Sequence, residues 1–409
     1  MRPTRRDFLR SSALVSFSAS VPLFLARSAF AAGKEARGNV LVVVELTGGN
    51  DGLNTVVPFK DDEYRKHRPR LHIAARSVLK IDDCLGFHPA LSGFARLLED
   101  GRLAVVQSVG YPNPNRSHFA SMAIWHTAKL AARTDAPGWI ARLLDAKGVA
   151  PGGDVPAIHL SSEPAPQPQA GGRHVPSLPS LEQFRRRLGI PESAGAAEQR
   201  AVLDRLAGRE HGRPGSLLNF VENSASLSYE SSARFEKVVA SGVGADYPQS
   251  GLARRLRVIA QLIKAGLTTS IYYTQLGGFD THASQLGAHG GLLFELGSSL
   301  QAFLGDLIKS GDGERVAVLV FSEFGRRLAE NASGGTDHGT AAPVFLAGPA
   351  VKAGLHGPYP NLRDLDDGDP KFAIDFRGVY ATLLDQWLGC PAEKVLGAKF
   401  QPLPLLQKT

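Results

Sequence analysis

The sequence has 409 residues and a formal net charge of +7. Residues 1–31 contain five arginines and one aspartate, so they hold +4 of that charge and leave about +3 for the rest. A balance this small argues against a nucleic-acid partner. The length suffices for one large domain or two ordinary ones. The two cysteines, Cys84 and Cys390, are too few for a disulfide-rich scaffold.

The first 31 residues contain the three parts of a twin-arginine export signal. A basic region includes Arg5-Arg6 and Phe8-Leu9, an apolar stretch covers residues 13–25, and Ala-Phe-Ala at 29–31 offers a cleavage site. The apolar stretch is short and contains serines, so it is a poor membrane anchor. We expect the twin-arginine translocase to be a partner during export. The mature chain, starting near Ala32, would then act in the periplasm or outside the cell, without a stable membrane span.

Short, nearly continuous apolar runs alternate with amphipathic segments along the rest of the chain. This pattern predicts an α/β fold with a mostly parallel central sheet flanked by helices. The predicted strands cover 40–46, 103–109, 268–276, 316–321 and 344–346, and the predicted helices cover 90–99, 252–267, 292–308 and 375–388. Residues 151–248 begin rich in proline, glycine and serine, and we interpret them as an insertion or cap within a single domain, 32–409.

Acidic and imidazole side chains gather where the predicted strands end. Asp51 follows the first strand, Asp280 and His282 follow the third, and Glu323 and Arg326 follow the fourth. Asp337 and His338 stand just before the fifth strand. Because ligands of open parallel sheets bind at the carboxyl ends of the strands, we expect these side chains to meet there. Taken one by one they have other interpretations: Asp51 as a turn residue, and Glu323 with Arg326 as a structural ion pair.

Aspartate and histidine together are the ligands of zinc, manganese and similar divalent ions. Two such ions a few ångströms apart stabilise displacement at phosphorus or sulfur. The sequence therefore predicts a pair of divalent metal ions at the carboxyl edge of the sheet.

Five stretches of this sequence resemble an exported bacterial family called domain of unknown function 1501. They are LTGGNDGLNTVVPF (46–59), NRSHF (115–119), GGFDTH (277–282), FSEFGRR (321–327) and GTDHG (335–339). That family is in turn remotely similar to the alkaline phosphatase superfamily, which includes the sulfatases. The resemblance implies an alkaline-phosphatase-like fold.

The superfamily resemblance also implies a ligand set. Asp51 and the Asp337-His338 element match the residues that hold one metal ion. Asp280 and His282 match residues that hold the other, and His356 matches the final histidine of that second set. His282 lies closer to Asp280 than is usual in the superfamily, which makes His289 a rival.

The resemblance leaves the nucleophile open. Ser117 lies in the appropriate region and is the candidate, with the N-cap of the helix after it as the alternative. Arg116 or Arg326 would hold the oxygens of an anion, and His118 would act as a ligand or proton donor. Cys84 does not lie in a sulfatase nucleophile motif.

The resulting hypothesis is an exported metallohydrolase of a phosphate or sulfate ester, whose substrate is a small anionic ester or a surface polymer. Two alternatives remain open. One is an envelope protein that binds metal without catalysis, and the other is a phosphodiesterase or phospho-group transferase of the same fold.

Overall fold

A computed structural model of the protein describes residues 38–131, 136–148, 156–161, 175 and 246–407. The predicted export signal and most of the predicted cap, 151–248, lie outside these residues. Among the described helices, none combines the length and apolarity needed to cross a membrane.

The central sheet has the strand order β12-β5-β11-β8-β1-β7-β6, and β15 also pairs with β5. The strands are β1 (Val40–Thr47), β5 (Leu103–Gly110), β6 (Ala157–Leu160), β7 (Ile271–Gly277), β8 (Val316–Ser322), β11 (Ala342–Ala347), β12 (Gly354–His356) and β15 (Ile374–Asp375). All pairings are parallel except those of β11, which runs antiparallel to β5 and β8. The predicted mostly parallel α/β sheet is confirmed.

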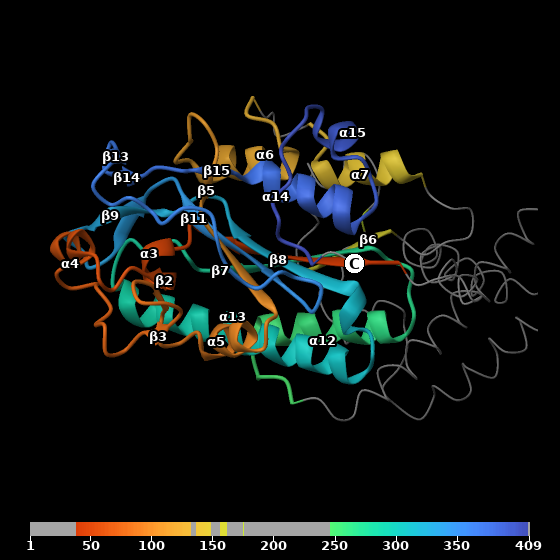
Figure 1. Ribbon diagram of the computed structural model, residues 1–409, viewed down its shortest axis with the longest axis horizontal. Coiled ribbons are helices and arrows are strands. Elements are labelled where there is room, and N and C mark those ends of the chain that lie inside the picture. The colour runs from red at the N-terminus through yellow and green to blue at the C-terminus, as the bar shows by residue number, and fades with distance from the viewer. Residues whose placement is uncertain (1–37, 132–135, 149–155, 162–174, 176–245, 408–409) are drawn as a thin grey trace, which may run out of the picture.

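Helices cover both faces of the sheet (Figure 1). One face is covered by α5 (Ser92–Glu99), α12 (Gly251–Lys264) and α13 (Gln285–Lys309). The other is covered by α6 (His118–Thr127), α7 (Trp139–Lys147), α14 (Phe376–Thr382), the π-helical η2 (Leu383–Trp387) and α15 (Ala392–Leu396). Successive residues of β1 point to opposite faces: Val42 packs in the first core and Val43 in the second. Burial on both faces explains why this strand is apolar from Val40 to Val44.

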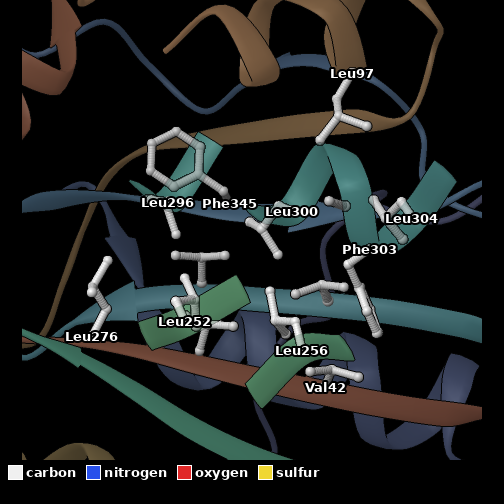
Figure 2. Close-up of a cluster of buried hydrophobic side chains, with 14 of the residues drawn as sticks. Val42, Leu97, Leu252, Leu256, Leu276, Leu296, Leu300, Phe303, Leu304 and Phe345 are labelled. Atoms are coloured by element: carbon white, nitrogen blue, oxygen red, sulfur yellow. The ribbon is translucent and has the colours of Figure 1, made fainter. Parts of the chain in front are cut away.

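Leucine and phenylalanine dominate the core between the sheet and helices α5, α12 and α13. Leu252 and Leu256 of α12, Leu300 and Phe303 of α13, and Val42 of β1 meet there (Figure 2). All five are fully buried. This packing fixes the sheet as a platform whose parallel strands end on one side.

Small elements gather at that end of the sheet (Figure 1). They are α3 (Gly52–Thr55), α4 (Asp62–His67), β2 (Val56–Val57), β3 (Leu79–Lys80), β4 (Gly86–Phe87), β9 (Arg326–Glu330), β10 (Thr336–His338), β13 (Leu365–Asp366) and β14 (Asp369–Pro370). The single-turn helix η1 (Gly313–Arg315) precedes β8. Strands β9 and β10 form an antiparallel ribbon that presents Asp337 and His338.

Two elements differ from the sequence-based expectation. Helix α13 starts at Gln285 instead of residue 292. Gly287, Gly290 and Gly291 lie inside its first turns, and because glycine is a poor helix former the sequence did not indicate a helix there. Strand β6 is an edge strand of the central sheet although it lies within the stretch interpreted as an insertion. Cys84 and Cys390 are both free.

Candidate metal centre

Three segments from distant parts of the sequence meet at the carboxyl edge of the sheet. The loop after β7 carries Asp280 and His282, the ribbon β9–β10 carries His338, and α6 begins at His118. The ligand atoms of His118, Asp280 and His338 all lie within 4.8 Å of one another. The parallel sheet thus assembles this group from residues up to 220 positions apart in sequence.

The Oδ1 atom of Asp280 is the centre of the group. The Nε2 atoms of His338, His282 and His118 lie 3.0, 3.1 and 3.5 Å from it. The Nε2 atoms of His282 and His338 are themselves 2.9 Å apart. Four atoms that can each donate an electron pair to a cation therefore surround one small volume.

Each imidazole ring is held at its other nitrogen. The Nδ1 atom of His118 donates to Oε1 of Glu323 at 2.8 Å, and that of His338 donates to the carbonyl oxygen of Arg116 at 2.8 Å. The Nδ1 atom of His282 donates to Oδ1 of Asp337 at 3.1 Å. Histidines that bind metal ions in proteins are typically oriented in this way, through a carboxylate or a backbone carbonyl.

These contacts determine the tautomers, because a carbonyl oxygen or an ionised carboxylate only accepts. With the proton on Nδ1, each neutral ring turns a lone pair at Nε2 toward Asp280. One added proton serves the His282–His338 pair but leaves Nε2 of His118, which is buried and has no hydrogen-bond partner. A divalent ion bound by His118, Asp280 and His338 would engage the Nε2 lone pairs of both histidines.

The spacing of the atoms suits such an ion. Ligand atoms about 2.0 Å from a tetrahedral zinc ion lie roughly 3.3 Å from one another. The observed separations around Asp280 span 3.0 to 3.5 Å. Within the group of His118, Asp280 and His338, both separations from Asp280 are thus close to the zinc value, and the two imidazole ligand atoms lie within 4.8 Å of each other. This set of donors fits a divalent ion.

The centre is open to solvent and strongly anionic at Asp280. The Asp280 side chain is 49 % exposed and that of His282 is 43 % exposed. Partial burial alone would raise the pKa of Asp280, but the hydrogen bond and the positive charge of Arg326, together with the contact with His338, outweigh it and lower the pKa to about 2. Asp280 is thus ionised and ready to bind a cation at any physiological pH.

Comparison with known proteins supports the first resemblance seen in the sequence. The model of the family described as "Protein of unknown function (DUF1501)" matches residues 127–387. The chain belongs to the DUF1501 family. No curated protein matches the sequence significantly.

Solved structures similar to this DUF1501 chain include sulfatases and an alkaline phosphatase. A sulfatase from Pseudoalteromonas sp. has 10% identity and a TM-score of 0.39, and the match covers 98% of this chain and 75% of that one. The lipoteichoic acid synthase of Listeria monocytogenes has 11% identity, a TM-score of 0.36 and coverages of 95% and 78%. An alkaline phosphatase from the Antarctic bacterium TAB5 has 10% identity, a TM-score of 0.30 and coverages of 76% and 92%. Similarity at this level does not transfer an activity.

Asp51, expected to be a metal ligand, lies elsewhere in this DUF1501 protein. Its side chain is fully buried and pairs with Arg68 at 2.6 Å. The same carboxylate accepts hydrogen bonds from Nε2 of Gln285 and, at 3.3 Å, from the backbone N of Asn54. Asp51 is also the N-cap of α3, a structural role other than the turn residue weighed from the sequence. With its oxygens committed to these donors, it is not a ligand of the centre.

The two other histidines proposed for the second ion are also held away from Asp280. His356 is at the end of the edge strand β12, where its Nε2 donates to the carbonyl oxygen of Lys352 at 2.7 Å. His289 is buried and contacts Oδ1 of Asn50 at 2.9 Å, and its pKa is lowered to about 4 because of burial. The described residues therefore assemble one ligand group, not the predicted pair.

Glu323 supports the centre without facing the ion position. Its buried carboxylate accepts from Nδ1 of His118 and, at 2.8 Å, from the backbone N of Gly48. The hydrogen bond that His118 donates to Glu323 is the largest of the effects that raise the pKa of His118. Glu323 is thus a partner of a candidate ligand rather than a ligand, and it does not form the ion pair with Arg326 weighed from the sequence.

The two arginines expected to bind an anion are occupied by protein acceptors. Arg326 is fully buried and donates to Asp280 and to the carbonyl oxygens of Gly48, Gly49, Phe279 and Thr336. Arg116 binds Asp367 and Asp369 of the β13–β14 hairpin. Both arginines hold loops of the centre together, so the expected role in holding substrate oxygens is not supported by these contacts.

Ser117, the candidate nucleophile, lies between Arg116, whose carbonyl oxygen binds His338, and the candidate ligand His118. It is the N-cap residue of α6, but its hydroxyl makes no capping hydrogen bond. The side chain is exposed, and its backbone N donates to Oδ1 of Asn115 at 2.8 Å. Its role as nucleophile stays a prediction.

Proposed function

We propose that this DUF1501 protein is an exported, metal-dependent hydrolase of a phosphate or sulfate ester that uses one divalent ion. The observation that carries the proposal is the convergence of the Nε2 atoms of His118, His282 and His338 on one carboxylate oxygen of Asp280. Asp51, expected to hold one ion with Asp337 and His338, and His356, expected to help hold the other, are both bound to other partners. The proposal therefore needs one ion only.

His118, Asp280 and His338 would hold the ion, since their ligand atoms form the mutually close group. Three protein ligands leave one tetrahedral position for substrate or water, as in catalytic zinc sites. A bound divalent ion supplies Lewis-acid polarisation of a phosphoryl or sulfuryl oxygen and concentrated positive charge. Zinc and manganese suit a set of imidazoles and one carboxylate better than calcium does.

His282 has a separate assignment because it stands beside the three ligands. Asp337 accepts from its Nδ1 atom, which leaves Nε2 to accept or return a proton. Nε2 also lies 3.1 Å from Oδ1 of Asp280, next to the ion position. His282 would thus take a proton from the attacking group at Nε2, while Asp337 keeps the ring oriented.

Arg326 contributes charge without touching the substrate. Its guanidinium is fully buried and lies 2.7 Å from Oδ1 of Asp280. A fixed positive charge beside the centre favours the approach of an anionic ester, and it costs no rearrangement during the reaction.

A specific observation favours a second candidate, a metal-binding envelope protein without catalysis. Both Arg116 and Arg326 direct their donors at protein acceptors. A metal-binding protein without catalysis would lack the nucleophile and the anion-binding groups that a phosphatase or sulfatase needs. Metal binding without turnover would be its signature.

The experiment compares metal content and hydrolysis in three purified proteins. Wild type is expected to bind about one equivalent of zinc or manganese and to cleave p-nitrophenyl phosphate or p-nitrophenyl sulfate. Asp280→Asn should lose both properties. Asp306→Asn is the matched control, because Asp306 binds Lys264 at the opposite end of α13.

The outcomes separate the candidates. A wild type that binds none of the tested ions would sink the metal site and both functions built on it. Stoichiometric binding without cleavage of either ester would favour the non-catalytic protein. If wild type hydrolyses either ester, replacing Ser117 by alanine tests the nucleophile. Unchanged hydrolysis in Ser117→Ala would exclude Ser117 from that role.

A further inference from the structure

Gln285 occupies a position that no role described above explains. It is the first residue of α13, it is fully buried, and its side chain reaches three others. Its Nε2 donates to Oδ2 of Asp51, while its Oε1 accepts from the hydroxyls of Thr281 and Thr336. The two threonines stand next to the residues of the metal centre.

We propose that Gln285 is a positioning residue that fixes the two ligand-bearing segments of the metal centre relative to each other. This inference rests on the metal site of the proposed function. Thr281 lies between Asp280 and His282, and Thr336 precedes Asp337 and His338. A single amide group therefore holds the loop after β7 and strand β10 at the same time.

The chemistry of the contact requires an amide. Gln285 donates to a carboxylate at one end and accepts two hydroxyl hydrogens at the other, at 3.1 Å from Thr281 and 2.6 Å from Thr336. A glutamate would turn an acceptor toward Asp51, and a methionine of similar size would satisfy none of the three partners. Because the partners are buried, losing the amide takes away the acceptor of both threonine hydroxyls and one of the donors to Asp51.

The backbone strengthens the same junction. The backbone N of Gln285 donates to the carbonyl oxygen of Gly334 at 2.9 Å, and that of Thr336 donates to the carbonyl oxygen of Thr281 at 3.2 Å. The loop after β7 and strand β10 are thus joined by main chain and side chain together. A relaxed junction would let Asp280 and His338 move apart.

The far side of the amide is anchored to the frame of the protein. Asp51 is fixed by Arg68, and both side chains are fully buried. Asp51 is not in the ligand group, and this connection assigns it a structural function instead. It holds the donor end of Gln285, and it acts on the centre through that residue.

The test measures cobalt binding by the whole protein, with visible absorption of the bound Co²⁺ as the readout. Gln285→Met is expected to bind Co²⁺ about 10-fold more weakly and to show altered visible bands, because it loosens the segments that carry Asp280 and His338. Changes to direct partners of metal ligands cost roughly 10- to 100-fold, and Gln285 acts one residue further away. Gln261→Met is the matched control, since Gln261 is also buried but lies on α12. Its cobalt affinity and spectrum should equal those of wild type.

A second variant covers the case in which Gln285→Met does not fold. Thr336→Val removes one hydroxyl and keeps the shape of the side chain. It should weaken cobalt binding in the same direction, and where both variants fold, their effects should not add because they remove a shared contact.

Three results would overturn the inference. Wild-type affinity and spectrum in Gln285→Met would refute the positioning role alone. If that variant does not fold, wild-type affinity in Thr336→Val would refute it instead. A wild type that binds no Co²⁺ would refute the proposed metal site, and the positioning role with it.

Discussion

Arg68 is the side chain whose removal should expose how the frame beneath the metal centre is stabilised. It is fully buried and donates to Oδ2 of Asp51 at 2.6 Å and to Oδ1 of Asn54 at 2.8 Å. It also donates to the carbonyl oxygens of Leu328 and Arg327, both at 2.8 Å. Arg68→Met keeps most of the apolar side chain and removes all four contacts.

The expected loss of unfolding free energy at pH 7 is at least about 4 kcal/mol. Removing one partner of a buried ion pair costs roughly 3–5 kcal/mol, because the remaining charge is buried without compensation. Each carbonyl oxygen left unpaired adds on the order of 1 kcal/mol or more where water does not reach it. Urea unfolding followed by circular dichroism measures the difference, and an unchanged m-value would show that the unfolded states are comparable.

The size of this loss should depend on pH. Burial alone raises the pKa of Asp51, and Arg68 provides the largest of the effects that lower it below its ordinary value. In wild type the ionised Asp51 therefore adds stability above its unfolded-state pKa, and this stability is lost as the pH falls. In Arg68→Met burial dominates and the pKa of Asp51 rises, so stability is lost as the pH increases through this range.

The two proteins should differ less at pH 4 than at pH 7. An equal difference at both values would refute the reasoning, because the charge of Asp51 would then not be its cause. A loss below about 1 kcal/mol at pH 7 would refute the buried pair as a major contact. Adding Asp51→Asn to Arg68→Met removes the uncompensated charge and should recover part of the loss at pH 7.

Three further outcomes are expected. In metal-free protein, Glu323→Gln should lower the pKa of His118 toward its ordinary value, because the hydrogen bond with the Glu323 carboxylate is the main cause that raises it; an NMR titration that shows no change would contradict this. Cobalt binding should weaken on acidification because the ion competes with a proton on His118. Since the pKa of His118 is raised, the weakening should start above the pH at which an ordinary histidine titrates. Titrations between pH 8 and 5.5 that give one constant affinity would speak against His118 as a ligand. Gly335→Ala should lower the melting temperature and the cobalt affinity, since a Cβ there would lie 2.2 Å from the carbonyl carbon of His282; Gly287→Ala meets nothing within 4 Å and serves as the control.

Much of the fold is visible in the sequence because buried parallel strands leave a strong signal. The run at Val40–Thr47 is mostly apolar since both faces of β1 are covered, and its short length, its valines and the glycines that follow it favour a strand over a buried helix. The direction of β11 is not visible in the same way. Ala342–Ala347 is equally buried, but its antiparallel pairing depends on a connection that the pattern of apolar residues does not encode.

The candidate site was predictable in part for a related reason. Asp280, His282 and His338 could be expected to meet because strand ends of a parallel sheet lie at one edge. The direction of a side chain at such an end is set by partners that the local sequence does not reveal. Asp51 turns inward because Arg68, 17 residues later, is buried beside it. The role of Gln285 was not predicted because the glycines in the first turns of α13 weaken the helical pattern there.

The backbone contact between residue 116 and His338 has a consequence for how the protein tolerates change. The acceptor is a main-chain oxygen, 2.8 Å from Nδ1 of His338, and every amino acid at position 116 supplies one. Scanning that position with other side chains would leave this contact in place, even where it breaks the ion pairs of Arg116 with Asp367 and Asp369. Adding or deleting one residue in the loop between β5 and α6 would shift the oxygen and turn the ring. The orientation of His338 should therefore tolerate a change of residue type at position 116 but not a change in the length of this loop.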